Sequence, residues 1–450
     1  MRTSITFRRD ARSLLVLGLP LIGSHLAQIA IHLTDVVMLG WYSVEALAAE
    51  VLAGSFFFLF FIMGSGFAWA VMPMVASALS SGQDVQVRRV TRMGAWASMM
   101  FAAAVLPLMI WSEPLLLILG QDPSTAVLAA DYLEIAGVVI FPALLVMVLK
   151  SYLAALERAQ VVLWVTLVAV VLNIGVNYLL IFGNFGFPEM GVRGAAIASL
   201  IVTTASMLAL GVYAARATPE HSLFTRIWRP DWEAFADVFR LGWPIGVTNL
   251  AETGLFAASS VMMGWLGTLP LAAHGIALQI ASVAFMVQVG LANAATVRAG
   301  QAFGLRDRSA LRSVAVASAI SSVGFALLTV VAFLLFPETL IGVFMSPSEP
   351  DRAGVLAIGV GLLAAAGLFQ LVDGGQVMAL GLLRGVQDTR VPMVIAGISY
   401  WIIGMPVSYV LGFTLGFGAI GIWMGLVVGL AVAALLLGLR FWRWTTRWAT

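Results

Sequence analysis

The stretch from Val51 to Ala70, VLAGSFFFLFFIMGSGFAWA, decides the fold, because it holds twenty residues in succession without a charged side chain. A helix needs about 20 predominantly apolar residues to cross the hydrocarbon core of a bilayer. The stretch lies within a longer apolar run, 47–79, which has enough length to tilt or to extend beyond the bilayer. We therefore interpret it as a transmembrane helix.

The remainder of the 450-residue chain has the same character, with 61% hydrophobic and only 10% charged residues and a mean hydropathy of +1.01. Soluble domains are about half apolar and a quarter charged, so this composition excludes a cytosolic enzyme, a nucleic-acid-binding protein and a disordered scaffold. The chain has no Cys and four scattered His, which argues against disulfides, Cys-ligated metals and HExxH zinc sites. We expect a polytopic membrane protein without a cofactor or catalytic residues.

Apolar runs separated by Arg-bearing breaks predict twelve membrane spans. Backbone within lipid must be helical or part of a closed barrel, and these runs are far longer than barrel strands, so the predicted fold is all-α. The predicted spans are 14–40, 47–79, 93–112, 126–149, 160–183, 191–215, 239–265, 270–297, 313–336, 353–382, 391–414 and 418–439.

The basic residues sort to one side of these spans. Of the 24 Lys and Arg residues, 22 fall on that side, and only Arg193 and Arg352 fall opposite, where the loops hold acids such as Glu45, Glu50 and Glu113. Because cytoplasmic loops carry the excess of Lys and Arg, the pattern predicts a multi-pass membrane protein with both termini cytoplasmic. The first span is longer than a signal-peptide core and has no evident cleavage site, so we expect it to be retained.

The two halves of the chain resemble each other. Gly18-Leu19-Pro20 matches Gly242-Trp243-Pro244, and Met38 to Trp41 matches Met262 to Trp265, both at an offset of 224 residues. Chance similarity between Leu- and Ala-rich helices is the alternative, but Pro, Gly and Trp agree at a constant offset. Each half holds six spans, which makes the repeat a parallel one, and such repeats build secondary transporters with their site at the repeat interface.

The repeat predicts a division of the chain into two lobes. The longest polar segment, 216–238, separates the halves, so we expect an N-lobe of six helices over 1–215, a cytoplasmic linker over 216–238 and a C-lobe of six helices over 239–450.

Three carboxyl groups lie deep inside predicted spans: Asp35, Glu252 and Asp373. Ionisable groups within a membrane are costly and become functional hypotheses by default. A buried carboxylate either stays protonated or is neutralised by a cation, which is the exchange that a proton-driven or sodium-driven pump needs. The alternative is a set of permanently protonated acids that hydrogen-bond between helices.

Polar residues accompany the first of these acids. Gln28, His32 and Asp35 share one side of their helix at about 100° per residue. Asn173 and Asn177 are four residues apart and therefore share a face; they would bond Asp35 or substrate, or act as interhelical clamps. His32 is either a satisfied polar core residue or a proton relay.

Glycine-rich segments such as Gly64–Gly66 and Gly421–Gly425 are typical of close helix packing in membranes. They are not phosphate loops, because no Walker lysine motif follows a Gly-rich turn, so ATP-driven transport is unsupported.

Several blocks of sequence carry a resemblance to a known family. They are Pro20 with Leu33 to Gly40, Leu172 to Tyr178, Asn249 to Glu252, Ala273 to Leu278, Gln370 to Gln376 and Gly381 to Gly385. In this order and spacing the chain resembles the multidrug and toxic compound extrusion (MATE) family, most closely its bacterial NorM-type branch, over essentially its whole length. The resemblance implies two six-helix lobes arranged as a V around a central cavity. It also implies a monomeric antiporter, surrounded by membrane lipids, that exports organic cations or other amphipathic small molecules against Na⁺ or H⁺.

The resemblance also assigns residues. Glu252 and Asp373 match the C-lobe acids for the coupling cation, where Na⁺ would bind, and Asp35 matches the acidic position of the first helix. The wider substrate and cation network would comprise Asn173, Asn177, Gln28, His32, Phe369 and Gln279.

Two positions depart from the pattern of the family. Phe369 stands four residues before Asp373, where NorM-type relatives commonly carry Tyr; this removes an oxygen ligand and weakens the case for Na⁺ at that site. The segment from Lys150 to Arg158 differs from the Gly-rich form usual at the end of the fourth span, and we interpret it as a loop difference.

The leading hypothesis is thus cation-coupled multidrug efflux. The second is a lipid-linked precursor flippase of the same wider superfamily, which predicts a basic cavity that would hold phosphates. The third is an integral-membrane acyl or glycosyl transferase, which would need a catalytic constellation near one interface, and none is visible in the sequence.

Overall fold

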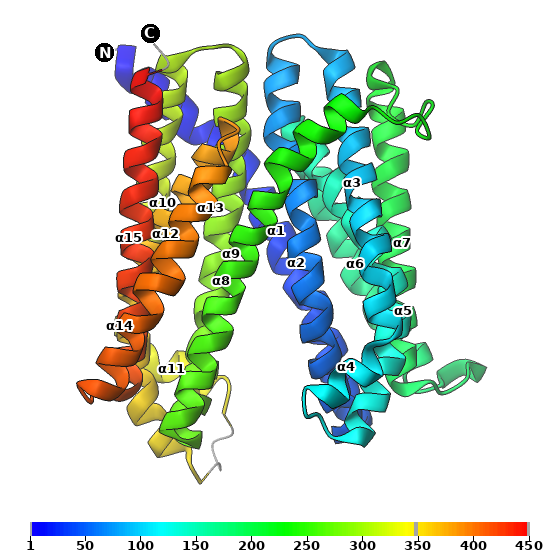
Figure 1. Ribbon diagram of the computed structural model, residues 1–450, viewed down its shortest axis with the longest axis vertical. Coiled ribbons are helices and arrows are strands. Elements are labelled where there is room, and N and C mark those ends of the chain that lie inside the picture. The colour runs from blue at the N-terminus through cyan, green and yellow to red at the C-terminus, as the bar shows by residue number, and fades with distance from the viewer. Residues whose placement is uncertain (1, 346–349, 448–450) are drawn as a thin grey trace. The chain divides into compact units, whose positions relative to one another are not determined.

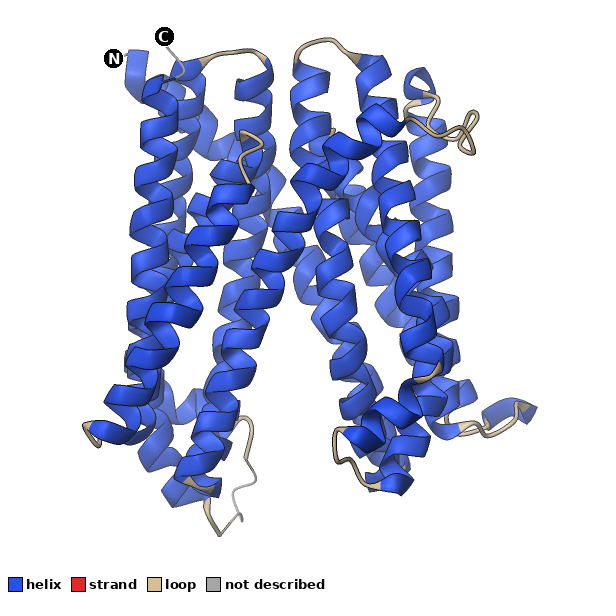
Figure 2. Cartoon of the chain, in the orientation of Figure 1, coloured by secondary structure: helices blue, strands red, loops and turns tan. Residues whose placement is uncertain are grey.

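The computed structural model describes residues 2–345 and 350–447, and all of the regular structure in this part of the chain is helical (Figures 1 and 2). The helices are α1 (Arg2–Tyr42), α2 (Val44–Ser80), α3 (Asp84–Ile110), α4 (Ser112–Ile118), α5 (Pro123–Ala155), α6 (Ala159–Leu180), η1 (Asn184–Gly186), α7 (Gly191–Ala217), η2 (Pro219–His221), α8 (Trp232–Leu266), α9 (Thr268–Gly304), α10 (Arg308–Leu335), α11 (Pro337–Gly342), α12 (Arg352–Gly385), α13 (Arg390–Gly397), η3 (Ile398–Gly404), α14 (Met405–Tyr409), η4 (Val410–Thr414) and α15 (Gly418–Arg447).

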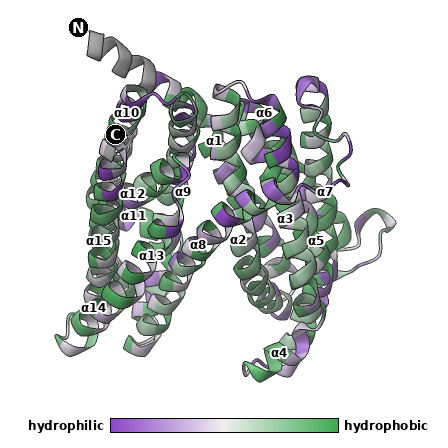
Figure 3. Ribbon diagram, turned by 45° about the horizontal axis from the view of Figure 1, so that its top comes forward, coloured by the Kyte–Doolittle hydropathy of each residue, from purple (hydrophilic) through white to green (hydrophobic). Residues whose placement is uncertain are grey.

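Among the described residues, eleven helices are long and apolar enough to cross a membrane. Hydrophobic residues dominate these long helices (Figure 3). The twelfth expected span, 239–265, lies within α8, which has 35 residues but is less apolar because Asn249 and Glu252 interrupt its middle. The predicted all-α fold is confirmed. The polar residues in the middle of α8 distinguish it from the other expected spans.

Contacts between helices divide the chain into two compact units. The N unit is Gly23–Gly246, and the C unit joins the residues up to Ile22 with those from Val247 onwards. The boundaries fall inside α1 and inside α8, so these contact units are not the sequence halves, and the division into 1–215, 216–238 and 239–450 stays a prediction.

Each unit is built around one central helix. In the N unit α5 packs against α2, α3 and α7, and in the C unit α12 packs against α9, α10 and α15. The helix lengths repeat as well: α2, α3, α4 and α5 have 37, 27, 7 and 33 residues, and α9, α10, α11 and α12 have 37, 28, 6 and 34. This confirms the internal repeat.

Large apolar side chains also cover the outer faces of the helices. On α10 they are Leu327, Leu328, Val331, Leu334 and Leu335, each at least 50% exposed. An exposed apolar surface of this extent is expected where lipid, rather than water, surrounds the helix.

The connection between α7 and α8 is pinned to α3 within the N unit. Arg89 Nη2 donates to Asp231 Oδ1 at 3.0 Å and to Glu233 at 2.7 Å, and this guanidinium holds the pKa of Asp231 below its usual range. Trp96 Nε1 donates to the Ile227 carbonyl at 2.8 Å. These bonds fix a segment that has little helix of its own.

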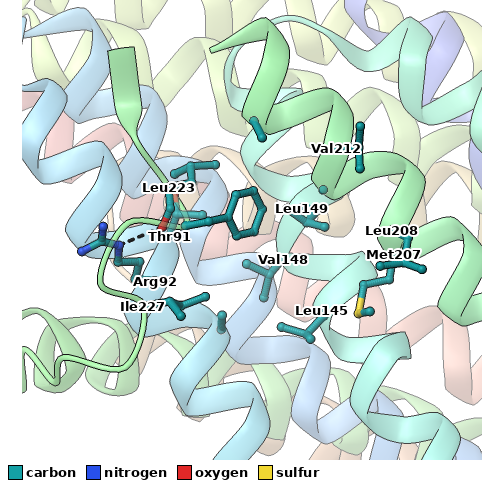
Figure 4. Close-up of a pocket in the computed structure, with 14 residues that line it drawn as sticks. Thr91, Arg92, Leu145, Val148, Leu149, Met207, Leu208, Val212, Leu223 and Ile227 are labelled. Atoms are coloured by element: carbon teal, nitrogen blue, oxygen red, sulfur yellow. Dashed lines mark hydrogen bonds between the residues drawn. The ribbon is translucent and has the colours of Figure 1, made fainter. Parts of the chain in front are cut away.

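The same connection covers a cavity of about 400 Å³ between α3, α5 and α7. Its walls are mainly apolar side chains such as Leu145, Val148 and Met207, and Arg92 at its edge donates to the Leu223 carbonyl at 2.8 Å (Figure 4). None of the residues that line it carries a carboxyl group, so this cavity is separate from the acids singled out above.

Candidate functional site

The C unit brings Glu252 of α8 close to Asp373 of α12. Asp373 is fully buried, and both of its carboxyl oxygens lack a hydrogen-bond partner among the described residues. Gln376, one helical turn further along α12, donates its Nε2 to Glu252 Oε1 at 3.3 Å, and the two acids interact electrostatically. Buried polar atoms are almost always hydrogen-bonded, so an unsatisfied buried carboxyl group marks a place for a proton or a cation.

Arg384 balances one of these two acids. It donates Nη2 to Asn249 Oδ1 at 2.9 Å and interacts electrostatically with Glu252. The negative charge of Glu252 therefore has a positively charged neighbour within the protein. Asp373, in contrast, has two carboxyl oxygens without a hydrogen-bond partner among the described residues.

Tyr400 is a further polar group in this part of the C unit, and the sequence had not identified it. Its side chain is fully buried, its hydroxyl group has no partner among the described residues, and it lies within electrostatic range of both Glu252 and Asp373. It lies in the π-helical segment η3, and π-bulges often occur at functional sites. The apolar run 391–414 holds both Tyr400 and Tyr409, and nothing in the sequence distinguished Tyr400 as a site residue.

Two residues predicted to belong to the network lie differently. Phe369 is 2% exposed and makes edge-to-face contacts with Phe256 and Trp423, with ring centroids 5.9 and 5.5 Å apart, so it forms part of an aromatic wall. Gln279 of α9 has an exposed side chain, and no bond recorded for the described residues joins it to Glu252 or Asp373.

In the N unit, Asp35 lies among the polar residues expected near it. Its Oδ1 accepts hydrogen bonds from Asn173 Nδ2 at 3.0 Å and from Asn177 Nδ2 at 2.6 Å. Ser199 of α7 donates to Oδ2 at 3.4 Å. The i, i+4 spacing of the two Asn residues on α6 lets both reach the same carboxyl oxygen.

Glu50 corrects one sequence-based expectation. We expected it in a loop, but α2 begins at Val44, where the side chain of Ser43 caps it, so Glu50 lies inside the helix and is 1% exposed. One of its oxygens has no partner among the described residues, and the other lies 3.7 Å from His32 Nδ1. The N unit therefore holds a second carboxyl group, which interacts electrostatically with Asp35.

Polar residues continue along α1 beyond Asp35. Ser24, Gln28, His32 and Asp35 follow at helical spacing and each meets another helix of the N unit: Ser24 bonds Thr166 of α6 at 3.3 Å, and Lys150 of α5 donates to Gln28 at 3.1 Å. We call these four residues the α1 polar ladder. Lys150 to Ala155 thus lie inside α5, so the interpretation of the segment from Lys150 to Arg158 as a loop difference was wrong for these residues and holds only for Leu156 to Arg158, which form the turn after the helix.

These features define a class of protein. Helices that cross the membrane carry buried, incompletely bonded carboxyl groups in both units, and intramembrane acids of this kind mark ion and substrate pathways. The arrangement is that of a secondary transporter.

Comparisons with known proteins narrow this class to a family. The sequence matches the MatE family over residues 20–179 and 244–410. It is 50% identical over 435 residues to a probable multidrug resistance protein NorM of Rhizobium meliloti (strain 1021), with 96% of this chain and 93% of the relative covered. It is 47% identical over 432 residues to the probable multidrug resistance protein NorM of Agrobacterium fabrum, with 96% and 93% covered.

Solved structures agree on the fold. A MATE crystallised with MaL6 superposes with a TM-score of 0.89 at 18% identity, covering 98% of this chain and 97% of the other. An outward-facing multidrug resistance MATE family transporter of the MOP superfamily gives 0.88 at 18% identity, with 98% and 97% covered. The chain belongs to the MatE family, in its NorM-type branch, and is a multi-pass bacterial membrane protein.

Proposed function

We propose that the chain is a secondary antiporter that exports cationic or amphipathic small molecules in exchange for Na⁺ or H⁺. We place it in the bacterial inner membrane, with both termini cytoplasmic. The relatives named as multidrug resistance proteins support the export function. The observation that carries the coupling mechanism is Asp373, a fully buried carboxyl group with no partner on either oxygen among the described residues.

Exchange follows from competition for that carboxyl group. When Asp373 is ionised, its negative charge attracts a cationic substrate. When a proton or Na⁺ neutralises it, the attraction disappears and the substrate leaves. Gln376 orients Glu252 by its hydrogen bond, and Arg384 supplies Glu252 with a positive neighbour, so Asp373 is the acid that changes its partner during the cycle.

Asp35 has a different part in this proposal. Its oxygens accept hydrogen bonds from Asn173, Asn177 and Ser199, so they are held in place and present a fixed negative group. We assign to Asp35 the attraction of the cationic part of the substrate within the N unit.

Efflux of ethidium from proteoliposomes, driven by an imposed Na⁺ gradient and separately by an imposed pH gradient, tests the proposal. Asp373→Asn keeps the size of the side chain and removes the charge, so we expect efflux to fall at least tenfold under whichever gradient drives the wild type. Glu338→Gln, a change of an exposed acid on α11, is the matched control and should leave efflux within twofold. Unchanged efflux by Asp373→Asn at equal protein content would overturn the mechanism.

The other hypotheses have less support. A lipid-linked precursor flippase would need a cavity lined by several basic residues, whereas the basic residues Lys150 and Arg384 are accompanied inside the helices by three acids, Asp35, Glu252 and Asp373. A transferase would turn over labelled donor substrate in the same proteoliposomes without any ion gradient, which separates it from a transporter.

A further inference from the structure

Lys150 is the only lysine in the chain; the other 23 basic residues are Arg. It lies inside α5, the central helix of the N unit, and is partly buried there. Its Nζ donates to Oε1 of Gln28 on α1 at 3.1 Å. This bond places an ammonium group beside the α1 polar ladder.

No acidic residue neutralises this ammonium group. Lys150 forms none of the ion pairs found in the described parts of the chain, and the titratable group that interacts with it electrostatically is His25, which carries no negative charge in either of its protonation states. Burying a charge without a partner is costly, and an amide oxygen satisfies only one of the three donors of an ammonium group. An anionic group of a bound molecule would therefore find a counter-charge at Lys150.

The ladder lies away from the apolar stripe of α1. Leu26 and Leu33 are 36% and 53% exposed and lie seven residues apart, hence on one face. Gln28 is two positions after Leu26, which turns it by about 200° from that face, and its side chain is exposed as well. Gln28 is therefore reachable from a side of α1 other than its apolar stripe.

Opposite charges flank the ladder. Asp35 follows Gln28 by seven residues, which is about 10.5 Å along a helix. His32 lies between them on α1, and Glu50 is its neighbour. The ladder is thus acidic at Asp35 and has a basic neighbour, Lys150, at Gln28. A molecule that carries both an amine and a carboxylate matches this order of charges better than a simple cation does.

We propose that Lys150 and Gln28 form an anion-binding subsite that takes the carboxylate of a zwitterionic amphipathic substrate, whose amine lies toward Asp35. The inference rests on the proposed export function, since it uses the same Asp35. It makes Lys150 a specificity-determining residue: Lys150 favours substrates with an anionic group, and plain cations bind without it.

Chemical modification of the unaltered protein tests this directly, because acetic anhydride has one lysine to acetylate. Rhodamine 110 carries a free carboxylate, and rhodamine 123 is its methyl ester. We expect rhodamine 110 to slow acetylation of Lys150, followed by peptide mass spectrometry, at least fivefold and rhodamine 123 less than twofold, with the N-terminal amine as internal reference. Equal protection by both dyes, or by neither, would overturn the proposal, and so would protection by phosphatidylglycerol micelles alone.

Variants give an independent readout through fluorescence anisotropy of the two dyes with purified protein. Lys150→Met should weaken binding of rhodamine 110 at least tenfold and that of rhodamine 123 less than twofold, whereas Lys150→Arg should keep both within threefold. Loss of both dyes to the same extent in Lys150→Met would contradict a subsite for the carboxylate. Wild-type protein that discriminates between the dyes but shows no gradient-driven ethidium efflux would refute the export function and leave the subsite standing.

Discussion

At the scale of single residues, Tyr400 carries a buried hydroxyl oxygen in the C unit, whereas Phe369 carries no oxygen atom in its side chain. Phe369 lies in an aromatic cluster with Phe256 and Trp423. The Tyr400 hydroxyl is buried without a partner among the described residues, within electrostatic range of Glu252 and Asp373. Cations such as Na⁺ are bound through oxygen atoms, and a neutral hydroxyl next to two carboxyl groups completes a better ligand set than two carboxyl groups alone.

Tyr400→Phe should therefore separate the two coupling ions. If Na⁺ binds in the C unit, the variant should lose at least tenfold of Na⁺-driven ethidium efflux and keep efflux driven by a pH gradient, because protonation of Asp373 does not need the hydroxyl. Removal of a buried polar group that has no partner costs little stability. The free energy of unfolding of the variant, measured by thermal unfolding, should therefore stay within about 1 kcal/mol of the wild-type value.

Tyr409→Phe provides the control, since Tyr409 is 52% exposed and should tolerate the change under both gradients. If Tyr400→Phe leaves Na⁺-driven efflux unchanged, the Tyr400 hydroxyl is not a ligand.

The sequence predicted the neighbours of Asp35 but not Glu50, and the reason lies at the scale of elements. The i, i+4 spacing of Asn173 and Asn177 within an apolar helix indicated that they share a polar face. Glu50 stands only six residues into α2, where the sequence suggested a loop. The signal was the hairpin itself: α1 ends at Tyr42 and α2 begins at Val44, so residues about seven positions on either side of the turn, such as Asp35 and Glu50, lie at the same height.

The hairpin of α8 and α9 repeats this geometry in the C unit. The positions that correspond to Asp35 and Glu50 at the offset of 224 are Ser259 and His274. His274 Nε2 lies 3.4 Å from Ser259 Oγ and 3.1 Å from Ser260 Oγ, and Trp423 donates to its Nδ1 at 3.0 Å. One unit thus holds two acids where the other holds a fully bonded histidine, a difference of chemistry within one backbone arrangement.

Close packing between helices in the C unit gives a second prediction. A Cβ at Gly425 of α15 would clash with the backbone nitrogen of Ser408 in α14, and a Cβ at Gly421 would lie 2.5 Å from the Leu411 carbonyl oxygen. These glycines bear out the packing role expected of Gly421–Gly425. Gly425→Ala should therefore destabilise the fold by about 1–3 kcal/mol, the usual cost of overpacking.

Gly438→Ala is the matched control, because it lies on the same helix and a Cβ there meets nothing within 4 Å. Better helix propensity should make it neutral or stabilising, by up to about 1 kcal/mol. Thermal unfolding of both variants in the same detergent measures the difference, and equal stability of the two would show that α14 can move away from α15 at no cost.

At the scale of the whole molecule, composition and apolar run length were sufficient to predict the class and eleven of the twelve expected spans; α8 is not among the described helices that are apolar enough to cross a membrane. Composition and run length could not predict where contacts divide the chain. α1 and α8 each contribute to both units, with boundaries after Ile22 and after Gly246. Hydropathy reports burial in lipid or protein along one helix, and it does not say which neighbours that helix has.

Orientation in the membrane is the prediction that belongs to the entire chain. The 22 basic residues on one side predict that the connection between α7 and α8 faces the cytoplasm and that the turn before α5 faces the periplasm. The chain has no Cys, so Thr225→Cys and Ser124→Cys, both at exposed positions, each introduce a single thiol. In intact cells with a permeabilised outer membrane, a membrane-impermeant maleimide should label Ser124→Cys and should label Thr225→Cys only after lysis. Labelling in the reverse order would contradict the predicted orientation. The direction of substrate transport in the proposed cycle would then be reversed as well.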